Sequence, residues 1–366
     1  MRCIVVVNLD ILCFLFLFIS SFIFIIYFFI YFHLSLSFIS SLLILIFVIF
    51  SSHSSPSNSF SMHPHTARNL LTISSHVVHG KVGNDAIQFP LNLRGWNVDC
   101  IHTTNFSNHP GYASFKGSKT DPEIIRSLFR GLQKIHVRYD AVIVGYICSK
   151  AVLEIVNHEI LQQLVPSTKI VIDPIMGDHG KLYVAEELVA VYKELLRPAG
   201  SNFSVDLLTP NQFEMEKLTD INITDKASLT QAIGAFFDMF SVKNLVITSV
   251  NFQDTQKISC VCATSKSSIT VITTPRINAS FSGSGDLFIG LLTDRFIKTG
   301  GDLISSLRNT IEVVQRVLEV TYSLTDRGNH PDSRIYIPDL RIIESKPYLL
   351  EDGVSEKDYQ GEIYRI

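Results

Sequence analysis

The sequence predicts an α/β domain with a mostly parallel sheet that helices cover on both faces. Three observations predict this fold class. From about residue 69 onward, short apolar runs typical of buried strands alternate with longer segments of helical periodicity. The chain has 366 residues, enough for one large or two ordinary domains. Polar side chains recur where the apolar runs end, at Ser75, Asp173, Thr209, Asn211, Glu214, Thr248 and Asp286.

The expected strands are short and rich in Val, Ile and Leu. They cover residues 69–73, 97–103, 140–145, 169–172, 205–208 and 244–248, and two further β segments cover 257–263 and 268–274. The carboxyl ends of parallel strands meet at one edge of an open sheet, which is where such folds bind ligands. The recurring polar side chains therefore predict a site at that edge.

Helical spacing of apolar residues predicts the connecting helices. They cover 86–93, 121–134, 149–164, 185–196, a segment after Glu214, 286–297 and 303–324. Asp121 is a candidate N-cap, with Pro122 at the first helical position. The tail after Pro331 shows little periodicity.

Charge and cysteine usage exclude several classes of protein. The formal net charge is −3 and no long basic run is present, so nothing indicates nucleic acid as a partner. The six cysteines form no Cys-x-x-Cys pair, and no histidine cluster has zinc spacing. Cys260 and Cys262 would share one face of a strand as apolar filler. This pattern is typical of a reducing compartment, and we expect a cytoplasmic protein, with the nucleus as an alternative.

Residues 11–50 contain no Asp, Glu, Lys or Arg. As one helix they would be about 60 Å long, roughly twice the bilayer core, and no turn residues divide them into two spans. One hypothesis is that 1–61 is translated upstream or intronic sequence, since Phe, Leu, Ile, Ser and Tyr share T-rich codons, with the functional start at Met62. The other is a genuine membrane anchor with a Ser-rich linker. We expect 62–366 to be the functional domain in either case.

The stretch Gly283-Ser284-Gly285-Asp286 precedes an apolar helical pattern. Amides in the first turn of a helix lack intrahelical partners and carry partial positive charge, and glycines let an anion approach them closely. Asp286 would stand at the same point, which suits a catalytic base beside a phosphoryl group. Taken alone, the stretch also fits an ordinary loop with an aspartate in the first helical turn.

Two further segments suggest a ligand site. Asp173 and Asp178 lie five residues apart after a strand, which suits water-mediated binding of a hard cation and polyphosphate, although Asp173 also fits a helix cap. The segment 105–112 is rich in polar and aromatic residues, as ligand loops often are, and it also fits a simple Asn-His-Pro-Gly turn.

Six motifs, in this order and spacing, resemble the pyridoxal kinase family of the ribokinase-like superfamily. They are Ser75-His76-Val77 with Gly80-x-x-Gly83-Asn84, Phe106-Ser107-Asn108-His109-x-Gly111-Tyr112, Asp173-Pro174-x-Met176-Gly177-Asp178, Thr209-Pro210-Asn211-Gln212-x-Glu214, Ile247-Thr248-Ser249 and Gly283-Ser284-Gly285-Asp286. The resemblance covers about residue 69 to the C-terminus. It implies a three-layer α/β/α fold with a central, mostly parallel mixed sheet, usually dimeric. It also implies transfer of the ATP γ-phosphoryl to the 5′-hydroxymethyl of pyridoxal, pyridoxine or pyridoxamine.

The resemblance also implies roles for individual residues. Asp286 would be the base, with the amides of Gly283, Ser284 and Gly285 as the anion hole. The substrate would contact Ser75, Phe106, His109 and Tyr146. The nucleotide would lie beside Asp173, Asn211, Thr248 and Ser249, under a lid that contains Tyr183. The metal region would comprise Asp173, Asp178, Thr209 and Glu214. The implied cofactors are ATP, Mg²⁺ with Zn²⁺ as an alternative, and K⁺ or Na⁺.

The chain departs from the family pattern at two of these positions. Pro110 stands where many relatives have Thr, which removes a side-chain hydrogen bond to substrate, and Ser284 replaces the usual Thr, a milder change because the backbone amide carries the role. Two alternatives remain open. One is a hydroxymethylpyrimidine kinase of the same fold, and the other is a catalytically inactive, membrane-tethered relative.

Overall fold

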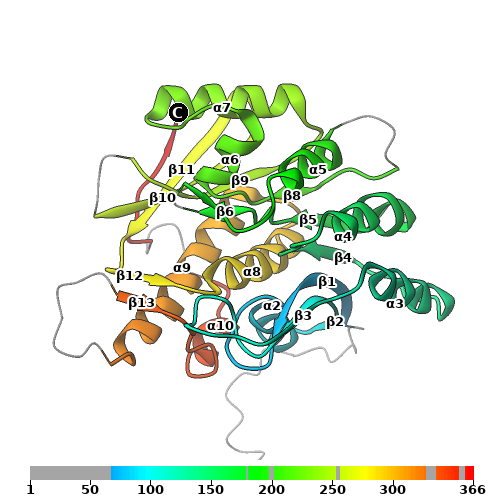
Figure 1. Ribbon diagram of the computed structural model, residues 1–366. Helices are drawn as coiled ribbons and strands as arrows, with labels where there is room; N and C mark the ends of the chain where they lie inside the picture. The colour runs from blue at the N-terminus through cyan, green and yellow to red at the C-terminus, as the bar shows by residue number, and fades with distance from the viewer. Residues whose placement is uncertain (1–66, 179, 198–201, 253–255, 327–334, 354–358) are drawn as a thin grey trace, which may run out of the picture. The chain divides into compact units, whose positions relative to one another are not determined.

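A mixed sheet of ten strands forms the centre of the described part of the chain (Figure 1). The structure is a computed structural model that describes residues 67–178, 180–197, 202–252, 256–326, 335–353 and 359–366. The expectations for residues 1–61 and for a start at Met62 fall outside these ranges. Within them, no helix is both long enough and apolar enough to cross a membrane.

The sheet has a parallel centre and antiparallel margins. Parallel pairing joins β2, β1, β4, β5, β8 and β9, and antiparallel pairing adds β3 at one side and β10, β11 and β14 at the other. The strands are β1 Arg68–Val77, β2 Trp96–Phe106, β3 Gly117–Lys119, β4 Ala141–Val144, β5 Lys169–Ile172, β8 Leu207–Leu208, β9 Leu245–Val250, β10 Lys257–Ser265, β11 Ser268–Pro275 and β14 Ile363–Arg365.

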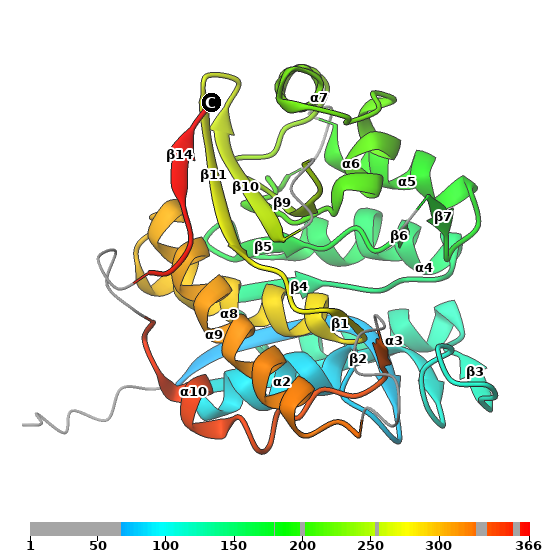
Figure 2. The ribbon, with the colours of Figure 1, turned by 90° about the vertical axis from the view of Figure 1, so that its left-hand side faces the viewer.

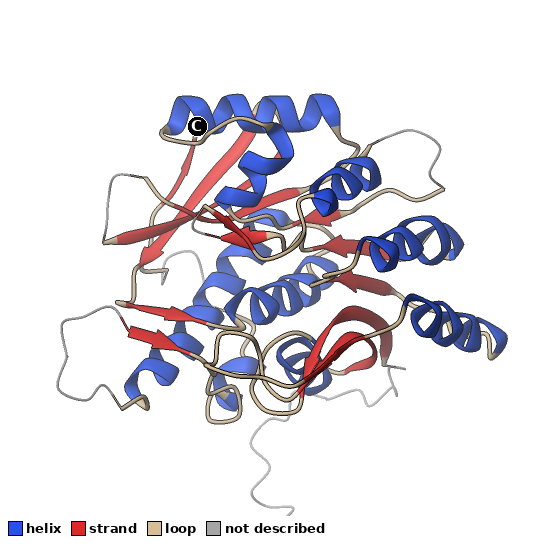
Figure 3. Ribbon diagram, viewed as in Figure 1, coloured by secondary structure: helices blue, strands red, loops and turns tan. Residues whose placement is uncertain are grey.

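Two short ribbons lie outside the main sheet. The first is an antiparallel pair, β6 Gly177–Asp178 with β7 Lys181–Leu182. The second is a parallel pair, β12 Ala279–Phe281 with β13 Ile335–Ile337, and it stands apart from the sheet in Figures 1 and 3.

Helices cover both faces of the sheet, as Figure 2 shows. One layer comprises α3 Pro122–Lys134, α4 Lys150–Ile155, α5 Glu187–Leu196, α6 Gln212–Thr219 and α7 Lys226–Met239. The other comprises α2 Asn84–Leu93, α8 Ser284–Lys298, α9 Leu303–Ser323 and α10 Lys346–Leu350. The expected three-layer α/β/α architecture with a mostly parallel mixed sheet is confirmed.

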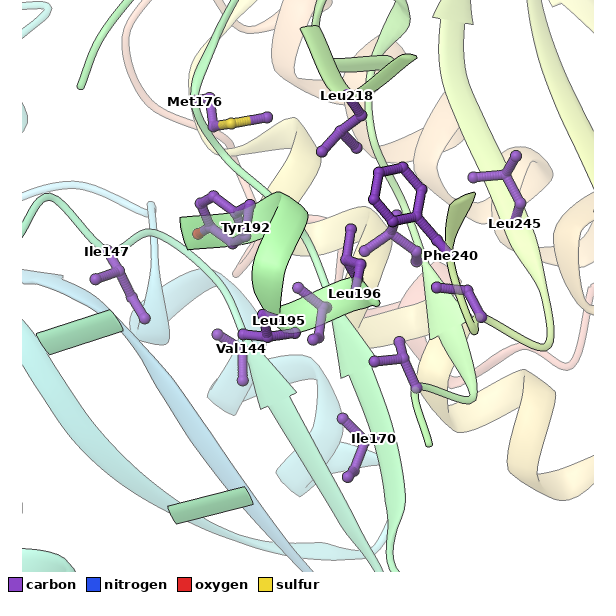
Figure 4. Close-up of a cluster of buried hydrophobic side chains, with 14 of the residues drawn as sticks. Val144, Ile147, Ile170, Met176, Tyr192, Leu195, Leu196, Leu218, Phe240 and Leu245 are labelled. Carbon is purple, nitrogen blue, oxygen red and sulfur yellow. The ribbon is translucent and has the colours of Figure 1, made fainter. Parts of the chain in front are cut away.

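Each face of the sheet has its own hydrophobic core. On the first face, strand residues such as Val144 and Ile170 pack against Tyr192 and Leu195 of α5 (Figure 4). On the second face, Ile143 packs among residues of α2, α8 and α9. Adjacent residues of β4 therefore enter opposite cores, because side chains alternate along a strand. The sequences of the central strands are continuous apolar runs because both faces of these strands are buried.

The sequence analysis did not predict the helix α7 or the short strands β3, β6, β7 and β12, and the structure also differs from the predicted elements in two further places. The helix expected over 149–164 ends at Ile155 and continues as a π-turn, Val156–Ile160, and a 3₁₀ turn, Leu161–Gln163. The tail after Pro331, where periodicity indicates no element, contains β13, α10 and β14. These elements are three to five residues long and pair with distant segments, so local periodicity carries no signal for them.

A buried carboxylate joins α8 to the end of α2. Asp294 is fully buried and accepts hydrogen bonds from Arg94, from Trp96 Nε1 at 2.8 Å and from Lys298 Nζ at 2.9 Å. Burial would raise the pKa of Asp294, but attraction to Arg94 and these hydrogen bonds outweigh it and lower that pKa. Arg94 in turn donates to the carbonyl oxygens of Leu349 and Glu351, which holds α10 in place.

We expect Asp294→Asn to destabilise the fold strongly, because the buried Arg94 guanidinium loses its buried counter-charge and keeps only the exposed Asp352. The expected loss is about 3 kcal/mol in the free energy of unfolding, measured by urea denaturation. Asp238→Asn is the matched control, since Asp238 pairs with Lys266 at the surface and should lose less than about 1 kcal/mol. Equal losses in the two variants would contradict this account of the cluster.

Candidate active site

Backbone hydrogen bonds between adjacent strands align the carboxyl ends of the parallel strands. Gly145 N donates to Ile73 O at 2.9 Å, and Asp173 N donates to Val144 O at 2.8 Å. Further along the same edge, Thr209 N donates to Ile172 O at 3.0 Å, and Thr248 N donates to Pro210 O at 2.9 Å. The residues that follow β4, β5 and β8 therefore lie in one row with Thr248 of β9, as the sequence predicts.

The Gly283 turn begins α8. Gly283 is the N-cap residue in a left-handed conformation, with φ +80°. A Cβ at this position would lie 2.1 Å from the carbonyl oxygen of Lys81, so only glycine fits both the dihedral angle and the space. The amides of Ser284, Gly285 and Asp286 precede the first intrahelical bond, from Leu287 N to Gly283 O. This geometry provides a group of backbone donors for an anion.

The carboxylate of Asp286 is half-buried in the first turn of α8 and accepts a hydrogen bond from the amide of Gly83. Burial raises the pKa of Asp286 to about 6, and the Gly83 amide partly counteracts that rise. Gly83 has φ +56°, and a Cβ there would lie 2.2 Å from the carbonyl oxygen of Ser75 and 2.4 Å from its Oγ. The Gly83 backbone thus lies between Ser75 and Asp286.

Asp173 is buried directly after β5, and its pKa lies well above the ordinary value. The causes are burial first, then repulsion from Glu214 and from Asp286, while a hydrogen bond from the Thr209 hydroxyl acts in the opposite direction. Carboxylates from three different elements therefore converge on one small region. A cation bound there would relieve the repulsion.

Glu214 has a structural role that the sequence analysis did not assign to it. Its Oε1 accepts the amide of Met176 at 2.9 Å, and its Oε2 accepts the amide of Asn211 at 2.8 Å. Asn211 Oδ1 accepts the amide of Glu214 in return, which completes a capping box at the start of α6. Asn211 Nδ2 also donates to Gly177 O at 2.7 Å, so this box anchors the β6–β7 ribbon.

The other residues predicted near the nucleotide lie around this ribbon and the end of β9. Asp178 is in β6, and Tyr183 follows β7 with its side chain exposed. Thr248 and Ser249 are half-buried at the end of β9. Ser249 has φ +54°, a conformation that costs energy for a residue with a side chain and that often occurs at functional sites.

The residues predicted to contact substrate lie at the ends of β1, β2 and β4. Phe106 packs edge-on against Phe115, and Tyr146 follows β4, where burial raises its pKa to about 12. His109 is buried, and both of its ring nitrogens have partners within the chain. Nδ1 accepts the amide of Gly111 at 3.1 Å, and Nε2 donates to Pro338 O at 2.9 Å. A contact between His109 and a ligand would therefore use the ring face or edge.

The oxygen donors suit a hydrated Mg²⁺ better than a fully protein-bound ion. Among the described residues, no three His, Cys, Asp or Glu side chains are grouped closely enough to hold a metal alone. Mg²⁺ commonly keeps several waters and is held by one or two carboxylates together with substrate phosphates. The buried, mutually repelling Asp173 and Asp286 fit that mode of binding.

Three residues around the site were not predicted as site residues from the sequence. Gly83 stands out only as part of a glycine motif, and its bond to Asp286 spans about two hundred residues. Tyr336 and Asp339 come from the tail after Pro331 and contact the loop that contains His109. No local pattern could identify them, because their partners are more than fifty residues away in sequence.

Solved structures define the class of protein. The pyridoxal kinase of Leishmania donovani in complex with ADP and pyridoxine matches with a TM-score of 0.69 and 28% identity, over 81% of this chain and 99% of that one. A Bacteroides thetaiotaomicron structure described as a phosphomethylpyrimidine kinase shares the fold, with a TM-score of 0.70 at 21% identity, over 83% of this chain and all of that one. The fold is that of the ribokinase-like superfamily.

Sequence relatives identify the family. The profile of the phosphomethylpyrimidine kinase family matches residues 98–331. The Saccharomyces cerevisiae protein named "Putative pyridoxal kinase BUD17" is 38% identical over 303 residues, which are 79% of this chain and 94% of that protein. The pyridoxal kinase of Arabidopsis thaliana is 34% identical, over 77% of this chain and 91% of that protein. The chain belongs to the pyridoxal kinase family.

We expect Gly83→Ala to disturb the site more than an ordinary glycine substitution, because the new Cβ would clash with Ser75. Gly95→Ala is the matched control, since Gly95 also has a positive φ, +88°, but has open space around it. Both variants place a side chain on a residue with positive φ, which costs about 1 kcal/mol or more. Gly83→Ala should lose about 2 kcal/mol beyond the control in urea denaturation, as unrelieved overpacking typically does. Equal losses would show that the contact with Ser75 relaxes without cost.

Proposed function

We propose that this chain transfers the γ-phosphoryl group of ATP to the 5′-hydroxymethyl group of pyridoxal, and also of pyridoxine and pyridoxamine. Family membership supports the reaction class, and the Leishmania donovani relative binds ADP together with pyridoxine or pyridoxamine. The single observation that carries the proposal is the placement of Asp286. Its carboxylate lies in the first turn of α8, whose first amides precede the intrahelical bonds, and it is close to the buried Asp173.

In the proposed mechanism, Asp286 accepts the proton of the hydroxymethyl group while that oxygen attacks the γ-phosphorus. A new O–P bond forms, the bond from phosphorus to the β,γ-bridging oxygen breaks, and ADP leaves. The amides of Gly283, Ser284 and Gly285 lie on this turn, and those that begin α8 stabilise the charge on the transferring group. A pKa of about 6 suits this base, because Asp286 is then mostly ionised at neutral pH yet more basic than an exposed carboxylate.

The remaining site residues divide between substrate and nucleotide. We propose that Ser75, Phe106, His109 and Tyr146 contact the pyridine ring. Asp173, Asn211, Thr248 and Ser249 would serve the nucleotide, with Tyr183 on the lid. Their positions along one edge of the sheet support this division.

We propose that Asp173, Asp178, Thr209 and Glu214 serve the metal–triphosphate region. Mg²⁺, with Zn²⁺ as an alternative, would neutralise charge on the triphosphate, and K⁺ or Na⁺ would fit the same oxygen-rich region. Glu214 already accepts three backbone amides, and burial raises its pKa to about 8, so its part would be mainly electrostatic, with its ionised form favoured when a cation is bound.

We also propose a homodimer located in the cytoplasm, or in the nucleus. The family resemblance supports the dimer, and the cysteine pattern supports a reducing compartment. A membrane location would follow only if residues 11–50 are part of the native protein.

A hydroxymethylpyrimidine kinase is the second candidate, because the matching family profile carries the name of phosphomethylpyrimidine kinase. The test is a direct comparison. The chain, in full and also started at Met62, is incubated with ATP, Mg²⁺ and each of pyridoxal, pyridoxine, pyridoxamine and hydroxymethylpyrimidine. We expect the 5′-phosphates of the B6 vitamers to form fastest. Faster phosphorylation of the pyrimidine would select the second candidate, and no phosphorylation at all would favour an inactive relative.

We expect Asp286→Asn to retain ATP binding and to lose turnover. The amide has nearly the shape of the carboxylate but cannot accept the proton, so kcat should fall about 10²- to 10⁴-fold. Steady-state kinetics with pyridoxal and calorimetric titration with ATP measure the two effects. Near-normal turnover would rule out Asp286 as the base.

The pKa of Asp286 predicts the acid limb of the pH profile. The protonated carboxyl cannot serve as a base, so kcat/KM for pyridoxal should be level above pH about 6 and fall about tenfold per pH unit below it. Circular dichroism over the same range checks that the fold persists. A level profile down to pH 5 in folded enzyme would contradict the assignment.

Removal of divalent cations should abolish activity. Without a cation, the buried carboxylate of Asp173 would repel the triphosphate. The assay is repeated in excess chelator and then with Mg²⁺ restored, which should recover the rate. Full activity in chelator would overturn the proposed role of Asp173, Asp178, Thr209 and Glu214.

A further inference from the structure

The segment Ile335–Asp339, which we call the β13 segment, lies beside the strand that leads into the Gly283 turn. β13 pairs in parallel with β12, so that Tyr336 lies opposite Ser280 and Ile337 opposite Phe281. One residue further on, Ser282 N donates to Ile337 O at 3.1 Å. The ribbon is visible at one side of Figure 1, separate from the main sheet. The β13 segment therefore fixes the backbone immediately before the anion-binding amides.

The same segment holds the loop 107–112, which follows β2 and contains His109. His109 Nε2 donates to Pro338 O at 2.9 Å, and the Tyr112 hydroxyl donates to Asp339 Oδ2. Burial raises the pKa of Tyr112 to about 12, and the bond to Asp339 adds to that rise. Both partners come from more than two hundred residues away in sequence, so the loop's conformation depends on the tail of the chain.

Tyr336 lies between this loop and the catalytic turn. Its hydroxyl is 2.6 Å from Ser282 Oγ. A Cβ on Gly111 would lie 2.1 Å from the same hydroxyl oxygen, so the loop backbone packs directly against it. One phenol group thus contacts both the residue before Gly283 and the centre of the His109 loop.

Asp339 also reaches the glycine loop that follows β1. Its carboxylate lies 3.8 Å from His79 Nε2, and a Cβ on Gly80 would lie 2.6 Å from its Oδ1. The β13 segment therefore contacts three separate loops: the one that leads to Gly83, the one that contains His109 and the turn at Gly283. On the proposed function, these loops respectively flank Asp286, the pyridine ring and the phosphoryl group.

We propose that Tyr336 and Asp339 are positioning residues that hold the pyridoxal-binding loop against the phosphoryl-transfer turn. The inference rests on the proposed function and adds to it the residues that set affinity for the vitamer. Asp339 acts through Tyr112, and Tyr336 acts through Ser282. Because the Asp339–Tyr112 contact holds the vitamer-side loop, its loss should weaken pyridoxal binding and leave ATP binding nearly unchanged.

The test measures binding and kinetics of Asp339→Ala, Tyr112→Phe and the double variant in the full chain. Calorimetric titration with pyridoxal, without ATP, should show about tenfold weaker binding in each single variant, the size of one hydrogen bond to a charged group. The double variant should be no weaker than Asp339→Ala, because both changes remove one interaction. The Kd for ATP should change less than about twofold, because changes at one site have little effect on binding at a distant, independent site.

Tyr336→Phe and Ser282→Ala form a second, milder pair that tests the same proposal if Asp339→Ala does not fold. Each should lower kcat/KM for pyridoxal by about threefold to tenfold, as loss of a neutral hydrogen bond does, and the double variant should match the single ones. Fully additive losses within both pairs would overturn the proposal, as would pyridoxal affinities unchanged from the wild type.

Tyr139→Phe is the matched control. Its hydroxyl donates to Asp99 Oδ2 at 2.7 Å, another tyrosine–aspartate bond, and Tyr139 precedes β4 at the opposite edge of the sheet. It should lower the melting temperature much as Tyr112→Phe does, with pyridoxal affinity intact. If Tyr139→Phe weakens pyridoxal binding equally, the effect is general destabilisation and the proposal is wrong. If the wild type itself neither binds nor phosphorylates pyridoxal, the proposed function fails first, an outcome distinct from a failure of the variants alone.

Discussion

Two glycines with positive φ position the backbone around Asp286. Gly283 turns the chain so that α8 begins close to Asp173, and Gly83 brings a second backbone segment against Asp286. A side chain at either position would collide with the backbone of Lys81 or Ser75. Burial raises the pKa of the Asp286 carboxylate, and the Gly83 amide that donates to it limits that rise.

The rest of the fold supplies a rigid base for that arrangement. The central strands pack side chains into a hydrophobic core on each face of the sheet, and this packing holds the strands in register. The buried Asp294–Arg94 pair joins α8 to α2 and α10 at the end of α8 away from the site. The orientation of α8, and with it the direction of its amides, is therefore determined from both ends.

The carboxylates of the candidate site create a local excess of negative charge. Asp173 is buried and is repelled by both Glu214 and Asp286, which is unfavourable for the protein alone. Backbone amides of the capping box lower the pKa of Glu214, but burial outweighs them and raises it to about 8. All three carboxylates therefore favour a bound cation or a proton, and Glu214 also contributes to the start of α6.

The sequence by itself determined the order of the longer strands and most helices, the edge of the sheet where the predicted site residues lie and the Gly-Ser-Gly-Asp turn, because all of these depend on local periodicity and glycine content. Apolar runs such as Ala141–Val144 identify buried strands without any knowledge of their neighbours. Only the tertiary structure decided that Glu214 accepts the amide of Met176, that the Gly83 amide bonds to Asp286 and that Tyr336 and Asp339 contact the loop of His109. The tail that contributes Tyr336 and Asp339 has strands of three residues, too short to show a period, and its partners lie more than fifty residues away. Contacts of that kind arise from the packing of the whole chain, and no local pattern encodes them.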